Sequence, residues 1–561
     1  MPTSKHVLTL TLVLGLCLDI TALSQEAPPF PDVNPNGFID SSDLFALASG
    51  WRNEADLSGR DVDGSGRVGP EDLSALLQQW RTNDLKLLWA KRAGGPRGDG
   101  GSGITSSGDG GVIATGRFSG SATFGEDDHQ VTLESAGGSN IFVAKYNSDG
   151  ELVWVRRAGG HRDDTGRAID SFPDGSFVVA GSFVRTATFG NGNREVVLNA
   201  GLFQSFFVAK YDSNGNLIWV KAPGISPTAD ADAYMPGSIG ETVTPVGAVH
   251  GIAATADGGA YLSGTFRETL TFGEEGRGGE RRPVTLTPEA KYDAFIAKYN
   301  ANGSLSWVRR DGVNDPMKYN LGLGITSLPD GSAAMSGLKG VRPSITEETA
   351  PGDPFVSKYN SNGTIAWERK WRSPFPALGE GIAVFSNGSV VVAGHFSSSA
   401  TFGEEILLTS AGSTDLFLAK YNSEGDLSWA LSDGGPQLDA AFGVAVSADD
   451  SILVTGTFEQ RARSGGSTFG EGTRRATLTS QGEDVFVVKY NPDGSLAATT
   501  SAGGPETDRG NAITTLPDGS VVVTGSFNGS ATFGEGEDQV VLNSEGESDV
   551  FIARYISIGS Q

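Results

Sequence analysis

A long internal repeat constrains the fold of this chain more than any other feature of its sequence. From residue 84 onward, a short apolar segment that ends in Lys-Tyr-Asn, or in a close variant of it, occurs seven times. Units of this length are too long for most helical repeats, and they suit four β-strands with their loops. The repeated tyrosines are Tyr146, Tyr211, Tyr299, Tyr359, Tyr421, Tyr490 and Tyr555, and neighbouring ones are 60 to 88 residues apart.

Each repeat contains the same succession of strand signals. A first segment ends at a turn such as Asp109-Gly110, a β-rich run such as residues 178–183 follows, and then comes Thr-Phe-Gly, as at residues 123–125. The Lys-Tyr segment is third, and a segment that carries tryptophan, such as Trp154, is fourth. Alternating apolar residues between Gly, Asn and Asp turns are typical of strands joined by hairpins. The 79 glycines follow no three-residue period, so they indicate tight turns rather than collagen.

The two ends of the repeat region complement each other. The last repeat stops near Tyr555 without its tryptophan segment, whereas residues 87–95 precede the first repeat and closely match residues 152–160. A sheet that takes strands from both ends would close a ring and leave no exposed sheet edge. We therefore expect an all-β, seven-bladed β-propeller over residues 84–557, closed by strands from the two termini.

This pattern resembles the bacterial SBBP-type β-propeller repeat family, which implies a fold but no common activity. Three repeats depart from the pattern: the fourth lacks Thr-Phe-Gly, the sixth has Ala498 in place of tryptophan, and the third holds inserts near Pro223–Val249 and Glu274–Pro288. We expect the recurring tryptophans and phenylalanines to pack between blades. We expect the Asn/Asp-rich hairpins to be plain turns.

Two twelve-residue segments near the N-terminus have the pattern of EF-hand calcium loops. Both begin with Asp, both have Gly at the sixth position, where the chain must turn sharply, and each is followed by a Leu, Leu, Trp pattern with helical spacing. Ca²⁺ prefers six to eight oxygen ligands, which such loops supply at fixed positions. The expected ligands are Asp32, Asn34, Asn36, the carbonyl of Phe38, Asp40 and Asp43 in the first loop, and Asp61, Asp63, Ser65, the carbonyl of Arg67 and Asp72 in the second.

The duplicated loops resemble the type I dockerin family over Phe30–Arg81, and we place the module at residues 30–82. The resemblance implies a small helical EF-hand-like module, two Ca²⁺ ions, folding coupled to the metal and docking to a cohesin-like or other surface protein. Ser41-Ser42 and Pro70-Glu71 stand where dockerins help to select the partner, and they differ between the two copies. The alternative is that both loops are turns without an ion.

The first residues predict export. Lys5 and His6 precede an apolar run from Val7 to Leu18, and small residues follow, so residues 1–24 are expected to be a signal peptide of a secreted or cell-surface, bacterial protein. The single cysteine lies in this signal, so the mature chain has no disulfide. The run is too short for a membrane span. The net charge of −25 disfavours nucleic acid as a partner.

The sequence shows no motif for catalysis or for an organic cofactor, and we name no catalytic residue. His129, His161, His250 and His395 are scattered, without a zinc-binding spacing. The leading hypothesis is a binding or display protein, tethered by its calcium module, with a carbohydrate or protein ligand on the propeller face near the inserts of the third repeat. The alternatives are a dockerin-bearing carbohydrate-active enzyme, either a polysaccharide lyase or a hydrolase, and a structural envelope protein. A cluster of two acids with His, Arg or Tyr at the central channel would favour the enzyme.

Overall fold

The computed structural model describes residues 85–226, 246–273, 283–341, 352–375, 377–460, 466–471 and 474–557. The chain divides into two units, residues 1–83 and 84–561, and everything described belongs to the second. The expected signal peptide, the calcium module and all its ligands from Asp32 to Asp72 lie outside the described residues, and so they stay predictions. No helix in the part that is described is long and apolar enough to cross a membrane.

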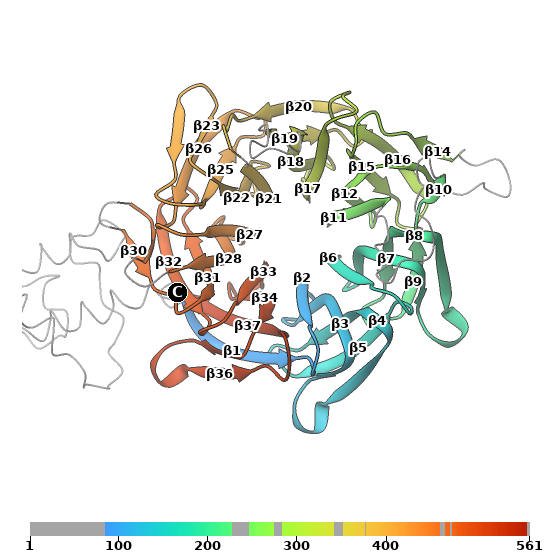
Figure 1. The fold of residues 1–561 in the computed structure, drawn as a ribbon, viewed down its shortest axis with the longest axis horizontal. Helices are drawn as coiled ribbons and strands as arrows, with labels where there is room; N and C mark the ends of the chain where they lie inside the picture. The colour runs from blue at the N-terminus through green and yellow to red at the C-terminus, as the bar shows by residue number, and fades with distance from the viewer. Residues whose placement is uncertain are drawn as a thin grey trace, which may run out of the picture. The chain divides into compact units, whose positions relative to one another are not determined.

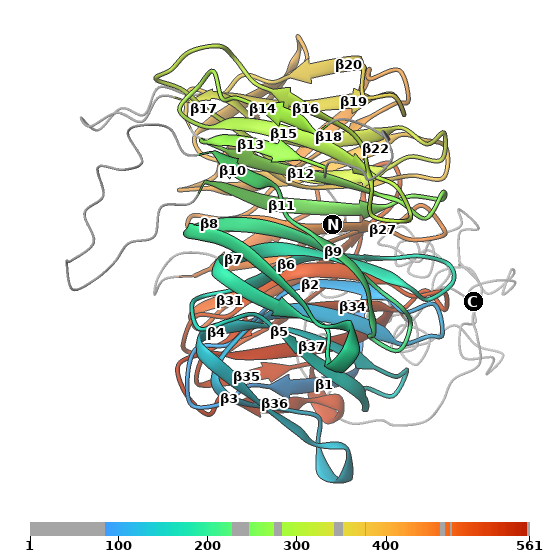
Figure 2. The same ribbon diagram turned by 90° about the vertical axis from the view of Figure 1, so that its right-hand side faces the viewer.

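Seven four-stranded antiparallel sheets form a closed ring, as the repeat predicts. The inner strands of neighbouring blades touch in order around the centre, and the contact between β33 and β2 completes the circle (Figure 1). Seen from the side, the strands run along the axis of the ring (Figure 2).

From inner to outer strand, blade 1 is β2 (Gly100–Ser106), β3 (Val112–Phe124), β4 (Val131–Tyr146) and β5 (Leu152–Ala158); blade 2 is β6 (Thr165–Ser171), β7 (Phe177–Phe189), β8 (Val196–Tyr211) and β9 (Leu217–Lys221). Blade 3 is β11 (Gly247–Ala254), β12 (Ala260–Phe266), β15 (Asp293–Tyr299) and β16 (Leu305–Asp311); blade 4 is β17 (Tyr319–Ser327), β18 (Ala333–Val341), β19 (Asp353–Tyr359) and β20 (Ile365–Lys370).

The remaining blades repeat this order. Blade 5 is β21 (Ala377–Val384), β22 (Val390–Phe396), β25 (Asp415–Tyr421) and β26 (Leu427–Asp433); blade 6 is β27 (Asp439–Val446), β28 (Ile452–Glu459), β31 (Glu483–Tyr490) and β32 (Leu496–Ala502). Blade 7 is β33 (Arg509–Thr515), β34 (Val521–Phe527), β37 (Asp549–Ser557) and β1 (Leu85–Ala93).

Blade 7 confirms the predicted closure between the two ends of the ring. Strand β1 pairs antiparallel with β37, so that Leu87 lies opposite Tyr555 and Trp89 lies opposite Arg554. Because the outermost strand comes from one end of the repeat region and the other three from the opposite end, backbone hydrogen bonds join the ends.

The Thr-Phe-Gly segments form outer hairpins that join neighbouring blades. Thr123 pairs with Gly94 from the blade before it, and equivalent bridges recur at four other junctions. The phenylalanine is buried against the third strand of its own blade; Phe189 and Phe207, for example, have ring centroids 4.7 Å apart. In blades 1 and 2 the hairpins are continuations of β3–β4 and β7–β8, with short 3-10 turns at η2 (Asp127–His129) and η3 (Gly192–Arg194). In the other blades that have one, the hairpin is a separate small sheet. These sheets are β10 (Gly224–Ser226) with β13 (Thr269–Phe272) and β14 (Val284–Leu286); β23 (Ser399–Phe402) with β24 (Ile406–Thr409); β29 (Ser467–Phe469) with β30 (Ala476–Leu478); and β35 (Ser530–Phe533) with β36 (Val540–Asn543), which are joined through η5 (Gly536–Asp538).

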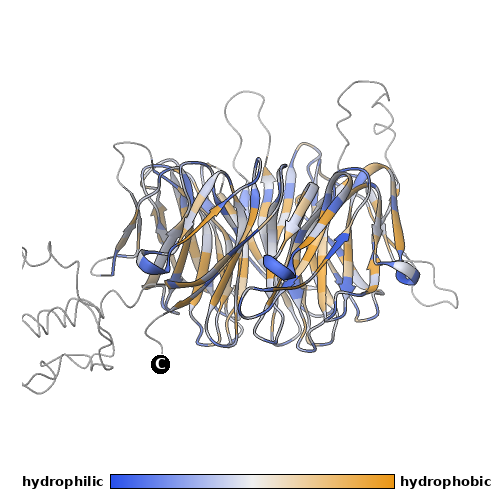
Figure 3. Ribbon diagram, turned by 90° about the horizontal axis from the view of Figure 1, so that it is seen from below, coloured by the Kyte–Doolittle hydropathy of each residue, from blue (hydrophilic) through white to orange (hydrophobic). Residues whose placement is uncertain are grey.

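The tryptophans pack between blades, as predicted. Trp219 of β9 donates from Nε1 to the carbonyl of Ala301 in the next blade at 3.0 Å, and Trp89, Trp307 and Trp367 make the same contact. Gly303 in that turn has a φ of 80°, and a Cβ added there would lie 2.7 Å from the Trp219 ring, so the turn requires glycine. Figure 3 shows the resulting pattern, with hydrophobic residues within the strands and hydrophilic ones in the loops at both rims.

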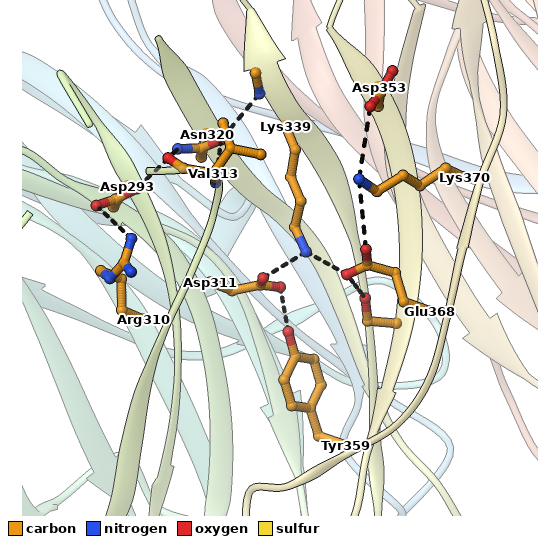
Figure 4. A network of polar contacts seen from close by, with 12 residues as sticks. Asp293, Arg310, Asp311, Val313, Asn320, Lys339, Asp353, Tyr359, Glu368 and Lys370 are labelled. Carbon is orange, nitrogen blue, oxygen red and sulfur yellow. Dashed lines mark hydrogen bonds and ion pairs between the residues drawn. The ribbon is translucent and has the colours of Figure 1, made fainter. Parts of the chain in front are cut away.

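Blade 4, which lacks Thr-Phe-Gly, holds a buried ionic network at its junction with blade 3 (Figure 4). The ammonium of Lys339, which is 5% exposed, lies between the carboxylates of Asp311 and Glu368. The hydroxyl of Tyr359 donates to Asp311. Burial and the negative Asp311 raise the pKa of Tyr359 well above its usual value, so the hydroxyl keeps its proton.

Polar pairs also occupy the junctions between blades. Between blades 3 and 4, Asn320 donates from Nδ2 to Asp293 at 2.8 Å, while its own oxygen accepts two backbone N–H groups (Figure 4). Between blades 1 and 2, Asn140 faces Asp164 in the same way. At three other junctions both positions are aspartate, and one buried oxygen of each pair has no hydrogen-bond partner in the described part of the chain. These pairs are Asp415 with Asp439, Asp484 with Asp508, and Asp549 with Asp99.

Candidate functional site

A β-bulge in every inner strand directs one side chain toward the central channel. In β2 the pairing register shifts between Gly101 and Gly103, which leaves Ser102 without a partner on β3. The other inner strands have register shifts at the equivalent place, and such bulges redirect a side chain out of the ladder. The seven residues, which we call the bulge ring, are Ser102, Arg167, His250, Leu323, Glu380, Phe442 and Asn511, and all of them line one cavity of about 420 Å³.

The bulge ring combines an identical backbone setting with seven different side chains. It holds a hydroxyl, a guanidinium, an imidazole, a carboxyl, an amide and two apolar groups. Residues from blades 7, 1 and 2 complete the wall on one side. A concave site of this size, with a few converging polar groups, has the properties of a small-ligand site. The added residues are Asp99, Gly100, Gly101, Arg117, Thr165, Ser526 and Ser548.

A second cavity, of about 560 Å³, adjoins the first. The two share Arg117 and Thr165, so the concave surface continues from the channel toward the junction of blades 7, 1 and 2. Together they offer room for a ligand longer than one small molecule. The second cavity is lined by Arg97, Gly98, Arg117, Ser119, Gly138, Ser139, Asp163, Thr165 and Glu547.

The walls of these cavities shift the pKa values of three titratable side chains of the bulge ring. The enclosing walls lower the pKa of Arg167, and the nearby Arg117 lowers it further. Burial, with a smaller effect of Arg167, lowers the pKa of His250 to about 4, so the imidazole is neutral at pH 7 and its Nε2 contacts Thr265 at 2.8 Å. Burial raises the pKa of Glu380.

Two of the acids in the walls already hold backbone groups. Asp99 accepts hydrogen bonds from the N–H groups of Gly95 and Ser119, both at 2.8 Å. Asp163 accepts from the N–H of Ser139 at 2.9 Å. These carboxylates fix the loops that shape the cavities, and this role distinguishes them from the arginines beside them.

Only some of the residues singled out from the sequence lie in this site. Of the four histidines noted from the sequence, His250 lies in the bulge ring, whereas His129 and His161 are exposed elsewhere and His395 packs beside Phe442. The central stretches of the two inserts in the third repeat, residues 227–245 and 274–282, lie outside the described residues. Sequence reasoning missed the bulge ring. Its signal was a varied residue two positions before the recurring Ile or Val of each inner strand.

The grouping expected for an enzyme, two acids with His, Arg or Tyr at the central channel, occurs in the lining of the first cavity, which includes Asp99, Glu380, His250 and Arg167. A second convergence of two acids, a tyrosine and a lysine, at Asp311, Glu368, Tyr359 and Lys339, lies between blades 3 and 4 and lines neither cavity (Figure 4). In the described residues, no group of three or more His, Cys, Asp or Glu side chains is placed to hold a metal ion.

Comparisons with known proteins find similar sequences but do not assign the chain to a family. No family model matches the chain. It is 22% identical over 529 residues to an uncharacterized WD repeat-containing protein, L264, of Acanthamoeba polyphaga mimivirus, covering 80% of this chain and 36% of that protein. It is 31% identical over 107 residues to the regulatory protein FlaEY of Caulobacter vibrioides, covering 18% and 11%. The chain thus spans about a third, or less, of the length of these relatives.

Solved structures with similar folds are distant. The quinohemoprotein alcohol dehydrogenase ADHIIG from Pseudomonas putida HK5 matches with a TM-score of 0.40 and 12% identity, covering 85% of this chain and 77% of that one. Sqt1 from Chaetomium thermophilum matches with a TM-score of 0.34 and 10% identity, covering 84% and 99%.

Proposed function

We propose that this protein is a ligand-binding platform in which the mouth of the propeller channel is the binding site. The observation that carries the proposal is the bulge ring. Seven equivalent strands each turn one side chain into the same cavity, and no two of these side chains are alike. A ring built only for stability would repeat its packing residues there, as it does with the inter-blade tryptophans.

A blocking substitution tests this proposal for any class of ligand. The full chain is screened against arrays of glycans, peptides and small metabolites, and each ligand found is retested with Ser102→Trp, which fills the cavity with an indole. We expect the substitution to abolish binding. The matched control is Val153→Trp on β5, where the side chain is 53% exposed on the outer strand. Ligands that bind the Ser102→Trp variant normally would contradict a site at the channel mouth.

We further propose that the platform is an exported SBBP-type propeller, tethered through the dockerin-like module of residues 30–82. The paired loops and their matched helix patterns support two Ca²⁺ ions and a cohesin-like or other surface partner. Calorimetric titration is expected to find two ions, and Asp32→Ala with Asp61→Ala is expected to abolish both. Unchanged calcium binding in this double variant would remove the proposal. Capture of a partner from the extracellular fraction, with and without chelator, tests the tether.

The second candidate function, a carbohydrate-active enzyme, is favoured by the acids Asp99 and Glu380, which line the first cavity together with His250 and Arg167. Glu380 projects into the channel with a raised pKa, as a general acid requires. Depolymerisation of a polysaccharide by the full chain, and its loss in Glu380→Gln, would establish this activity. Binding that persists in Glu380→Gln without any turnover by the native chain favours the platform.

A further inference from the structure

Three arginines lie at the channel mouth among the acids Asp99, Asp163, Glu380 and Glu547, and Arg117 acts electrostatically on Asp99. The chain has 67 acidic and 42 basic side chains, yet Arg97, Arg117 and Arg167 line the two adjoining cavities. Within the residues that the structure describes, none of the three forms an ion pair or a side-chain hydrogen bond. Other arginines of the ring do have acid partners, among them Arg92 with Asp549 at 2.8 Å.

The three arginines come from neighbouring parts of the ring and line the same pair of adjoining cavities. Arg97 belongs to the loop before β2, Arg117 to β3 and Arg167 to β6. Arg117 lines both cavities and repels Arg167 electrostatically. Like charges held close together repel each other, and an anion between them would relieve the repulsion. Guanidinium groups bind carboxylate and sulfate groups through paired hydrogen bonds.

The rest of the lining favours a ligand rich in hydroxyl groups over a peptide. Hydroxyl and amide side chains dominate, and only Leu323 and Phe442 offer large apolar groups. Peptides usually bind through aromatic or aliphatic anchors that fill apolar pockets, and these walls provide few such pockets. The lining residues with hydroxyl or amide side chains are Ser102, Ser119, Ser139, Thr165, Asn511, Ser526 and Ser548, and the acids Asp99, Asp163, Glu380 and Glu547 lie among them.

We propose that the two adjoining cavities bind an acidic oligosaccharide, with its carboxylate or sulfate groups against Arg97, Arg117 and Arg167. This inference rests on the proposed binding function of the same site and adds the chemical class of the ligand. Two cavities in line, with arginines along both, suit an extended ligand that bears more than one negative charge.

The test compares ligands that differ in charge and hardly in shape. Calorimetry with the full chain uses tetragalacturonate, its fully methyl-esterified form, a heparin-derived tetrasaccharide and a tetra-aspartate peptide. We expect at least one acidic saccharide to bind, the methyl ester not to bind, and the affinity to fall as salt is added. Comparison of the uronate and the sulfated saccharide identifies the anionic group.

Variants place the interaction at the three arginines. Arg117→Gln and Arg167→Gln are each expected to weaken binding about tenfold or more, as loss of a hydrogen bond to a charged group does. Both side chains are exposed to solvent, so the fold should persist, and thermal unfolding verifies this. The control is Arg156→Gln, which removes an arginine over the Trp154 ring on the outer strand and should leave binding unchanged.

Three outcomes overturn the inference: the methyl ester binds as well as the acid, only the peptide binds, or the arginine variants bind normally. If a neutral ligand then binds and is lost in Ser102→Trp, the binding function stands and only the ligand class is wrong. If no ligand responds to Ser102→Trp, the binding function fails as well.

Discussion

The paired aspartates between blades are expected to make the propeller less stable as the pH rises. Asp99 is 1% exposed. Its pKa is raised from 3.8 to about 7, mainly by burial and also by the adjacent Asp549, while its two backbone hydrogen bonds and Arg117 act in the opposite direction. Arg92 neutralises part of the charge on Asp549. The folded ring thus holds a proton that the unfolded chain releases near pH 4. Its stabilising effect is complete below that pH and is lost as the pH rises through about 7.

The substitution Asp99→Asn removes this titration and copies an arrangement that the protein already uses. Between blades 3 and 4, Asn320 accepts two backbone N–H groups with one oxygen and donates to Asp293. Asp99 accepts its two N–H groups on different oxygens, so the asparagine must turn to accept both on its single oxygen, as Asn320 does. Its amide group can then donate to Oδ1 of Asp549, which is buried without a partner in the described part of the chain. A pKa of 3.8 in the unfolded chain and about 7 in the fold implies a loss of roughly 2–3 kcal/mol between pH 5 and pH 8, which the variant should avoid.

Thermal unfolding of the full chain at pH 5 and pH 8, at one calcium concentration, measures the effect. An unfolding entropy of about 1 kcal/mol/K for a ring of this size converts the loss into a Tm difference of roughly 2–3 °C. We expect the fall in Tm from pH 5 to pH 8 to shrink by that amount in Asp99→Asn. Asp128→Asn, at an exposed 3-10 turn, is the control and should leave the fall unchanged. An equal fall in Asp99→Asn and the native chain would refute the buried proton.

Three further substitutions test the scaffold. Gly394→Ala would place a Cβ 1.8 Å from the carbonyl oxygen of Leu378, so we expect a loss of about 3 kcal/mol or more and a lower urea midpoint; a native midpoint would contradict the close packing. Lys339→Met leaves the buried carboxylate of Asp311 without its cation, whereas the partly exposed Glu368 keeps Lys370; this should cost about 3 kcal/mol in urea unfolding, and a stabilised variant would show that the network is dispensable. Trp219→Phe loses an inter-blade hydrogen bond and should lower the free energy of unfolding by about 1 kcal/mol; no change would assign the contact to packing alone.

The ring could be predicted from the sequence because its determinants are local and repeated. Turn glycines, alternating apolar residues and the unmatched segment near Trp89 are all visible in the chain, and β1 pairs with β37 as expected. The junction pairs could not be predicted, because Asp99 and Asp549 are 450 residues apart and meet only when the ring closes. The buried network of Lys339 was hidden for a similar reason, since its carboxylates come from two different blades.

The candidate site was missed for a different physical reason. A bulge is a property of two paired strands, so the place where Ser102 leaves the ladder is set by the register between β2 and β3; the recurring Ile or Val two residues later marks the position but does not show that the strand bulges there. Polar and apolar residues alternate along an inner strand whether or not the register shifts. Only the aligned strands reveal that Arg167, His250 and Glu380 occupy one equivalent position and face one cavity.

The same geometry explains why this position is free to vary while its neighbours repeat. The tryptophan of an outer strand must reach the turn of the next blade, and the phenylalanine of Thr-Phe-Gly must pack on the third strand, so every junction requires the same side chains. A bulge residue faces the channel, and its contacts with neighbouring blades differ from one position to the next: Asn511 donates to the carbonyl of Gly101 and Phe442 packs beside His395. Substitutions there alter the chemistry of the cavity at little cost to the ring, which is the property that a binding scaffold needs.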